Sequence, residues 1–263
     1  MKWPNTLVAI RHGQSAYNVQ KIKQEADPTY VEFMQAYDRF EEDPEKNRDE
    51  ALAIAKLLHA EGNYRFSSGD HDTPITAEGE RQAEVTGREL ANILPLPDVI
   101  MVSPYLRTRQ TLGHMAMGWP ELSGVETIEE ERLREQEHGL RAVYGDWRIF
   151  NVMFPDQFEL RRMQGPYWYR HLQGENVPDV RERTRSLIGT VIREYSEQDV
   201  WWITHHLTKL SLRANFERFG AEEFLRLDEE EKPVNCGVTI YRGMPELGKD
   251  GKLELDAYNQ QLY

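Results

Sequence analysis

The stretch TLVAIRHGQSAYN, from Thr6 to Asn18, decides how the rest of the chain is interpreted. Its first part, Thr6 to Ile10, is apolar and largely β-branched, which predicts a short buried strand. An arginine and a histidine follow the strand directly, and Gly13 provides a turn after them. The fold and the chemistry then depend on which other segments form strands and on which side chains stand at their ends.

Further segments have the pattern of strands: Asp98 to Val102, Val200 to Thr204, and the alternating residues Val234, Cys236, Val238 and Ile240. Helical apolar spacing separates them, over about 76–94, 103–117, 180–195 and 207–219. Thr76 is the expected N-cap of the first of these helices, and Ser103 with Pro104 is the expected start of the second. The alternation predicts an α/β fold, a three-layer α/β/α sandwich with a mostly parallel central sheet, in a single domain over 1–263.

The composition excludes several classes of protein. With 32 Lys and Arg against 45 Asp and Glu, the chain has a formal net charge of −13, which repels nucleic acid. No stretch approaches the roughly 18 uninterrupted apolar residues of a membrane span. The N-terminus lacks the apolar core of a secretory signal, and the single cysteine, Cys236, cannot form an internal disulfide. We therefore expect a cytoplasmic protein that binds neither nucleic acid nor membranes.

Three polar segments fall at predicted strand ends: RHGQSAYN (Arg11 to Asn18), SPYLRTRQT (Ser103 to Thr111) and THH (Thr204 to His206). The carboxyl ends of parallel strands meet at one edge of a sheet, where ligands bind in α/β folds. The three segments therefore bring two arginines and two histidines to one place. Such a group is suited to hold a dianionic phosphoryl group through charge-assisted hydrogen bonds.

Together with DTPITAEGERQA (72–83) and LREQEHG (133–139), these segments resemble the ordered motifs of the histidine phosphatase superfamily. The similar branch includes cofactor-dependent phosphoglycerate mutases and fructose-2,6-bisphosphatase. The segments REQEHG, YWYRHLQGEN (167–176) and PVNCGVTIY (233–241) look most like the broad-specificity phosphatase-like members. The resemblance covers most of the chain and implies a phosphoglycerate mutase-like fold.

The resemblance also implies a role for each residue of the site. His12 would be the nucleophile that forms a phosphohistidine, and Arg11, Arg107 and His205 would hold the phosphoryl oxygens. Asn18 is matched by an asparagine that lines the pocket in many members. The neighbouring arginines also favour the neutral imidazole that a nucleophile requires. The sequence does not name the acceptor that fixes the tautomer of His12.

Glu135 lies four residues before Gly139, which is the spacing of the proton donor in the family. Its role would be to protonate the leaving oxygen and then to deprotonate the attacking water. Glu137 competes for this role, and both residues also fit solvated acids in a run that begins at Glu129. We favour Glu135 because it alone keeps the spacing.

His206 stands where the family usually has a glycine, and two interpretations stay open. Its imidazole narrows the pocket or contacts the substrate, or it opens the next helix and points away. Because fructose-2,6-bisphosphatase also carries a side chain at the equivalent place, the change is compatible with activity.

Two segments elaborate the predicted domain, at about 20–69 and at about 140–178. The first has a helical stripe of Tyr30, Phe33, Met34 and Tyr37, and a second helix is expected near 48–60. It is either a lid that governs specificity or an interface within a homodimer. The second is expected to form a cap whose aromatic residues are mostly core: Trp147, Phe150, Phe154, Tyr167, Trp168 and Tyr169. Three cap arginines either reach a second anionic group on the substrate or are solvated: Arg161, Arg162 and Arg170.

The resulting prediction is a metal-independent phosphatase that hydrolyses a phosphomonoester of a small metabolite. Asp70, His71 and Asp72 lack the two-histidine helical spacing of a metal site, so no metal or organic cofactor is implied. A mutase is the first alternative, but the stretch after the proton-donor motif has few of the basic residues that mutases of the family carry there. A phosphoprotein phosphatase and a non-catalytic scaffold that binds phosphorylated ligands are the others.

Overall fold

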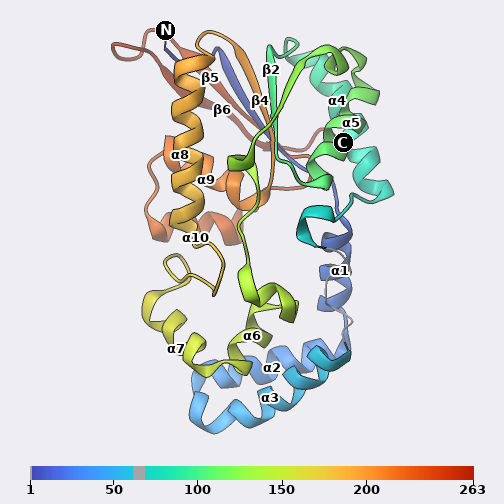
Figure 1. Cartoon of the computed structure of the whole chain (residues 1–263), viewed down its shortest axis with the longest axis vertical. Helices are drawn as coiled ribbons and strands as arrows, with labels where there is room; N and C mark the ends of the chain where they lie inside the picture. Colours follow the sequence, from blue (N-terminus) through green and yellow to red (C-terminus); the bar gives the residue numbers. More distant parts are fainter. Residues whose placement is uncertain (1, 62–68) are drawn as a thin grey trace. The chain divides into compact units, whose positions relative to one another are not determined.

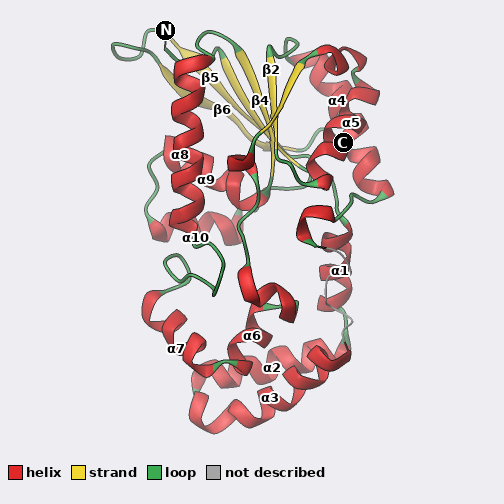
Figure 2. Cartoon of the chain, viewed as in Figure 1, coloured by secondary structure: helices red, strands yellow, loops and turns green. Residues whose placement is uncertain are grey.

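A six-stranded sheet organises the larger part of the chain in the computed structural model, which describes residues 2–61 and 69–263 (Figures 1 and 2). The strand order is β3-β2-β4-β1-β5-β6. The strands are β1 (Thr6–Arg11), β2 (Val99–Val102), β3 (Glu126–Glu129), β4 (Asp199–Thr204), β5 (Val238–Met244) and β6 (Lys252–Gln260). Strands β1 to β4 run parallel, β5 pairs antiparallel with β1, and β6 pairs antiparallel with β5. The sheet is therefore mostly parallel.

Successive side chains of the central strands point to opposite faces of the sheet, and each face is covered by helices. Val8 and Ile10 pack with α4 (Ala77–Ile93) and α5 (Leu106–Gly118). Leu7 and Ala9 pack on the other face with α8 (Val177–Glu194) and α9 (His206–Phe216). Figure 2 shows the two helix pairs on either side of the yellow sheet. The predicted three-layer α/β/α sandwich is confirmed.

The segment around Cys236 differs from the prediction. Val234 and Cys236 alternate with Val238 in the sequence, but β5 begins only at Val238 and runs antiparallel to β1. Cys236 is fully buried and has a φ of 48°. This left-handed backbone conformation is incompatible with a β-strand, so the strand begins after it. Its amide N–H donates to the carbonyl oxygen of His12 at 3.2 Å. The apolar alternation thus reflects a loop buried under the site rather than a longer strand.

The start of α5 also differs. Thr76 caps α4 as predicted, since its hydroxyl accepts from the N–H of Gly79 at 3.2 Å. Ser103 does not cap α5, whose first residue is Leu106 and whose N-cap position is Tyr105. The Ser103 hydroxyl is turned instead toward His205. The sequence predicts an N-cap at Ser103 because capping a helix and contacting His205 both use a small hydroxyl side chain after a strand.

A second compact unit is helical and consists of Ala16–Asp70 and Glu137–Asn176; the sheet unit comprises the other residues. Its elements are α1 (Ala16–Glu25), α2 (Pro28–Glu42), α3 (Pro44–Glu61), η4 (Gly139–Tyr144), α6 (Trp147–Met153) and α7 (Pro155–Gln164). Both predicted elaborations fall almost entirely in this helical unit, apart from residues 62–68, which lie outside the described residues. The aromatic stripe of α2 packs with α3, α6 and α7, so this unit has its own core.

The remaining elements of the sheet unit are η2 (Pro120–Gly124), η3 (Glu131–Leu133) and α10 (Ala221–Glu230). The short helix η1 (Asp70–Asp72) lies at the boundary, with its first residue in the helical unit. In the described parts of the chain, no helix combines the length and the apolar character that crossing a bilayer would need.

Candidate active site

The three polar segments predicted from the sequence meet at one edge of the sheet. Strands β1, β4 and β2 are parallel neighbours, with Ile10 paired to Ile203 and Ile203 to Val102. Parallel strands in this register end together, so the residues that follow them share one edge. The next residues of β1 and β4, Arg11 and Thr204, are also register partners.

His12 is 4% exposed and lies directly after β1. Its Nδ1 lies 2.8 Å from the carbonyl oxygen of Gly13. A carbonyl only accepts, so Nδ1 carries the proton and Nε2 keeps its lone pair. Burial, and then the positive charges of Arg107 and Arg11, hold the pKa of His12 well below its usual range. The imidazole is therefore neutral, with a nucleophilic Nε2.

His205 follows β4 and is fully buried beside His12, with 5.2 Å between the ring centroids. Its Nδ1 accepts from Nε of Arg107 at 3.3 Å, and its Nε2 lies 2.8 Å from the hydroxyl oxygen of Ser103. Tyr105 packs edge-on against His205 at 5.0 Å and under the Arg107 guanidinium at 4.8 Å. Burial, and then Arg107, hold the pKa of His205 well below its usual range.

Ser103 and Tyr105 also contact His205, and the sequence did not predict these contacts. Both belong to the motif SPYLRTRQT, which also contains Arg107. The signal that could have found Ser103 is its position directly after β2, at the same edge as His12 and His205.

Arg11 is anchored by the loop before β5. Its NH1 donates to the carbonyl oxygen of Pro233 at 2.6 Å, while its buried Nε has no hydrogen-bond partner among the described residues. The same loop holds the backbone of His12, because the side-chain amide of Asn235 donates to the His12 carbonyl at 3.1 Å. Arg11 and His12 are thus positioned by one loop.

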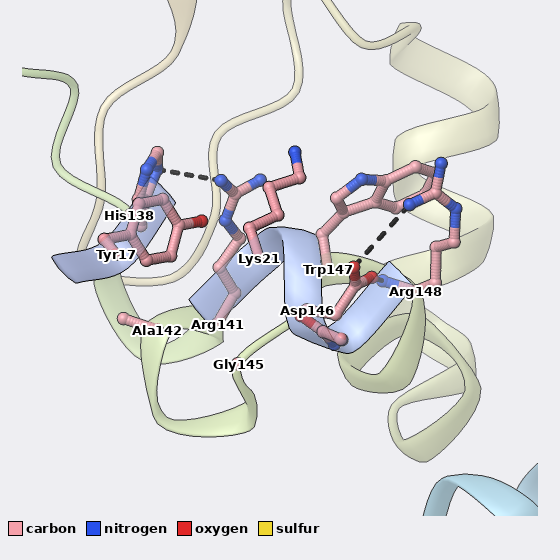
Figure 3. A pocket seen from close by; sticks show the side chains of 10 residues that line it. Tyr17, Lys21, His138, Arg141, Ala142, Gly145, Asp146, Trp147 and Arg148 are labelled. Atoms are coloured by element: carbon pink, nitrogen blue, oxygen red, sulfur yellow. Dashed lines mark hydrogen bonds and ion pairs between the residues drawn. The ribbon is translucent and has the colours of Figure 1, made fainter. Parts of the chain in front are cut away.

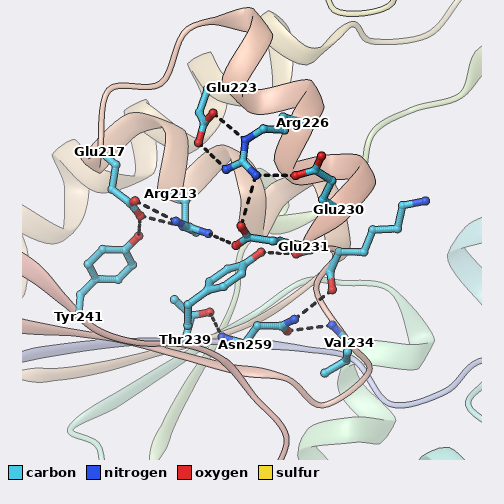
Figure 4. A network of polar contacts seen from close by, with 12 residues as sticks. Arg213, Glu217, Glu223, Arg226, Glu230, Glu231, Val234, Thr239, Tyr241 and Asn259 are labelled. Atoms are coloured by element: carbon cyan, nitrogen blue, oxygen red, sulfur yellow. Dashed lines mark hydrogen bonds and ion pairs between the residues drawn. The ribbon is translucent and has the colours of Figure 1, made fainter.

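A polar network in the sheet unit holds the loop at 232–235 through hydrogen bonds with Asn259 (Figure 4). The Asn259 side chain accepts from the N–H of Val234 at 2.8 Å and donates to the carbonyl of Lys232 at 3.0 Å. Asn259 has a φ of 54°, which asparagine tolerates better than most residues. Arg213 extends the network through ion pairs to Glu217 and Glu231.

Glu135 lies against the first turn of α9. Its carboxylate accepts from the N–H of Leu207 at 3.1 Å and from the N–H of Gln136 at 3.0 Å. Three side chains tie the segment before it: Thr204 to the Leu133 carbonyl, Thr208 to the Arg134 carbonyl, and Arg183 to the Arg132 and Glu135 carbonyls. The Glu135 charge also acts on Arg11. The structure therefore brings Glu135 to the edge that holds Arg11 and His205.

Other predicted residues are placed differently. Glu137 belongs to the helical unit, where its backbone N–H donates to the Glu175 carboxylate at 3.0 Å. Asn18 lies on α1 of the helical unit, and its role toward substrate stays a prediction. His206 is the first residue of α9, as one interpretation expected, and its Nε2 hydrogen-bonds the carboxylate of Asp228 on α10. A contact of His206 with substrate also stays a prediction.

The cap arginines separate into two kinds. Arg162 is exposed and pairs with Glu159, whereas Arg161 stacks on the Trp147 ring with its guanidinium 4.0 Å from the ring centre. Most of the aromatic residues expected in the cap core are buried or half-buried, but Trp168 is 57% exposed. His71 contacts Asp72, and among the described residues no three His, Cys, Asp or Glu side chains gather closely enough to hold a metal ion.

Close packing of the motif backbones explains their glycines. A Cβ on Gly13 would lie 2.6 Å from the carbonyl oxygen of Gly79, and one on Gly79 would lie 2.2 Å from that of Gln14. The N–H of Gly13 donates to the Thr111 hydroxyl at 2.9 Å, and Thr111 in turn bonds the Arg107 carbonyl. The segment after β1, the first turn of α4 and the first half of α5 are therefore packed closely against one another.

The fold and the site define a class: an α/β protein with two buried neutral histidines and two arginines at the carboxyl edge of its sheet. The sequence pattern of the Histidine phosphatase superfamily (branch 1) matches residues 59–248. The chain belongs to this superfamily. The matched segment includes Arg107, Glu135 and His205, whereas Arg11 and His12 precede it.

Individual relatives share less than a third of their residues with this chain. The phosphoglycerate mutase-like protein AT74H of Arabidopsis thaliana is 28% identical over 225 residues, which cover 76% of this chain and 75% of that protein. A mycobacterial glucosyl-3-phosphoglycerate phosphatase, solved with inorganic phosphate, has a TM-score of 0.61 and 18% identity over 98% of both chains. A phosphoserine phosphatase from Entamoeba histolytica, solved with 3-phosphoglyceric acid, has a TM-score of 0.62 and 13% identity over 98% of this chain and 99% of that one. At these identities the structures show a shared fold.

Proposed function

We propose that the protein is a metal-independent phosphatase that hydrolyses a phosphomonoester of a small metabolite through a phosphohistidine at His12. The observation that carries the proposal is the 2.8 Å contact of His12 Nδ1 with the Gly13 carbonyl. It fixes the tautomer that leaves Nε2 unprotonated, and burial beside two arginines keeps the ring neutral.

In the first step Nε2 of His12 attacks phosphorus, and the bond from phosphorus to the ester oxygen breaks. Arg11 and Arg107 hold non-bridging oxygens through charge-assisted hydrogen bonds that stabilise the transferring group. His205 holds a further oxygen when its Nε2–H exchanges the Ser103 hydroxyl for the phosphoryl group. The orphaned Nε of Arg11 supports this role, because a buried donor without a partner is suited to a ligand oxygen. Glu135 in its protonated form gives its proton to the leaving oxygen.

In the second step the Glu135 carboxylate takes a proton from water. The water oxygen attacks the phosphohistidine, the phosphorus–nitrogen bond breaks, and inorganic phosphate leaves with His12 and Glu135 restored. The backbone N–H groups of Leu207 and Gln136 hold the carboxylate in place for both transfers. The names of two similar structures, both phosphatases, support hydrolysis over transfer to a second hydroxyl.

The test is phosphate release by the wild type and by His12→Ala, with EDTA present, across sugar phosphates, phosphoglycerates, nucleotides and phosphopeptides. Release from a small phosphomonoester that is lost in His12→Ala is the expected result. Turnover only of 3-phosphoglycerate, and only with a bisphosphorylated primer, would show a mutase. Release that EDTA abolishes would overturn the metal-independent mechanism.

A further inference from the structure

The helical unit contains a pocket that the proposed mechanism does not use (Figure 3). Residues of α1, η4, the turn after η4 and α6 line it, and all belong to the helical unit. The polar side chains that matter for its chemistry are Lys21, Gln24, His138, Arg141, Asp146 and Arg148. Almost all of them are hydrogen-bond donors or cations.

Arg141 is held in this pocket by neutral partners. Its NH2 donates to Nδ1 of His138 at 2.9 Å, and its NH1 lies 3.4 Å from Nε2 of His171. Burial, and then the charge of Arg141, lower the pKa of His171 to about 3, so this imidazole is neutral. No carboxylate forms an ion pair with Arg141 in the described parts of the chain. The guanidinium is therefore oriented without being neutralised.

Asp146 is the one carboxylate among the described lining residues, and other groups already occupy it. One of its oxygens accepts from the Tyr30 hydroxyl at 2.7 Å and the other from the backbone N–H of Arg148 at 2.7 Å. Its ion pair with the Arg148 guanidinium, at 3.6 Å, is on the far side of the pocket from Arg141 in Figure 3. Among the described residues, neither Lys21 nor Arg141 forms an ion pair with a carboxylate. The pocket therefore keeps two positive charges in a protein of net charge −13.

Gln24 gives an independent indication of a ligand. Gln24 is only 5% exposed and lines the pocket. Its Nε2 nevertheless has no hydrogen-bond partner among the described residues. Leaving a buried donor unsatisfied costs about 1–3 kcal/mol. A bound anion would supply the missing acceptor and is one of the explanations for a buried donor of this kind.

We propose that this pocket binds a phosphate group, held by the side chains of Arg141, Lys21 and Gln24. A phosphate dianion has acceptor oxygens on all sides and matches donors that converge from different elements. Its two charges balance the two that the pocket leaves uncompensated. The group is either a second phosphate on the substrate or a free phosphate ion, and the chemistry of recognition is the same for both.

Calorimetric titration with inorganic phosphate at constant ionic strength tests the pocket directly. Arg107→Ala weakens phosphate binding at the catalytic edge and leaves the helical unit unchanged, so one phosphate site is expected to remain in this variant. Gln24→Glu, added to it, places a near-isosteric negative charge in the pocket and is expected to weaken that site at least tenfold. Lys21→Met, at an exposed position that folding does not require, is expected to weaken it about fivefold to tenfold.

Arg162→Met is the matched control, because Arg162 is in the same unit but is exposed and paired with Glu159. It is expected to bind phosphate as the parent does. The proposal is overturned if the Arg107→Ala protein binds no phosphate, or if its binding is unchanged by both Lys21→Met and Gln24→Glu in proteins that remain folded by circular dichroism.

The two sources of the phosphate group are separated by kinetics with a sugar bisphosphate and the matching monophosphate. If the pocket takes a second phosphate of the substrate, Lys21→Met raises KM for the bisphosphate and leaves KM for the monophosphate unchanged. If it takes free phosphate, both KM values stay as in the wild type while the titration still shows the site. Absence of turnover in the wild type, with phosphate binding intact, would contradict the proposed phosphatase function and not this pocket.

Discussion

The Nε of Arg107 on α5 donates to Nδ1 of His205 at 3.3 Å, so the histidine that follows β4 orients the arginine. A neutral partner fixes the guanidinium without cancelling its charge. The contact with His205 therefore leaves the guanidinium charged toward an anionic ligand at this edge of the sheet. The same arrangement recurs in the helical unit, where Arg141 is held by His138 and His171.

Replacing Arg107 is therefore expected to impair phosphate capture severely. Arg107→Ala should lower kcat/KM by about 10²- to 10³-fold, the usual effect of removing one donor that stabilises developing charge. Lys46→Ala, at an exposed position, is the control and should change kcat/KM less than twofold. Comparable losses in the two variants would show that long-range charge, not the local contact, governs capture.

Ser103 is expected to contribute to both stability and activity. Ser103→Ala leaves the buried Nε2 of His205 without its partner, which costs about 1–3 kcal/mol of unfolding free energy in urea titrations. Ser103→Thr keeps the hydroxyl and should recover part of the loss. Ser186→Ala removes an exposed hydroxyl and should change stability by less than about 0.5 kcal/mol. Equal stabilities of Ser103→Ala and the wild type would show that the contact is not formed in solution.

Asn259 is expected to act as a positioning residue. Asn259→Ala removes both bonds to the loop at 232–234, and through this loop it loosens the Pro233 carbonyl that anchors Arg11. We expect kcat/KM to fall about tenfold, mainly through KM, because phosphate capture depends on the position of Arg11. Asn92→Ala, at an exposed helical site, provides the control. A loss of stability with unchanged KM would limit Asn259 to a structural role.

Buried neutral histidines predict that the protein loses stability in acid. The pKa values of His12 and His205 lie well below 6.5, and that of His171 is about 3. Below pH 6.5 the unfolded chain binds protons at these histidines and the native protein does not, so unfolding becomes easier as pH falls. Between its lowered native pKa and pH 6.5, each histidine reduces the free energy of unfolding by about 1.4 kcal/mol for each unit that the pH falls. Well above pH 6.5 it has no effect.

Urea unfolding at pH 7.5, 6.5 and 5.5 measures this dependence. We expect little change between the first two values and a clear loss between the last two. His171→Gln, which cannot take up the proton, should lose less free energy between pH 6.5 and 5.5 than the wild type does. An identical loss in the two proteins would contradict the lowered pKa of His171.

Much of the fold could be read from local patterns. The β-branched run Thr6–Ile10, the apolar stripe from Val180 and the cap residue Thr76 act over a few residues, and the structure confirms the elements that they predict. The edge strands β3 and β6 were not predicted, because both are largely exposed and lack a clear alternation of apolar residues. Cys236 was misplaced because burial alone does not distinguish a strand from a packed loop.

The sequence by itself determined which residues stand at the ends of the parallel strands, since motif spacing and strand pattern are local properties. It therefore grouped Arg11, His12, Arg107 and His205 at one edge, and the resemblance to the histidine phosphatase superfamily added Glu135. Only the tertiary structure decided how they are held: the Gly13 carbonyl at His12, Ser103 at His205, and Asn259 behind the Arg11 loop. The partners of Ser103 and Asn259 lie 25 to more than 100 residues away, and no local pattern encodes such contacts. The phosphate pocket has the same origin, because packing of α1 against η4 and α6 brings Gln24 and Arg141 to one cavity.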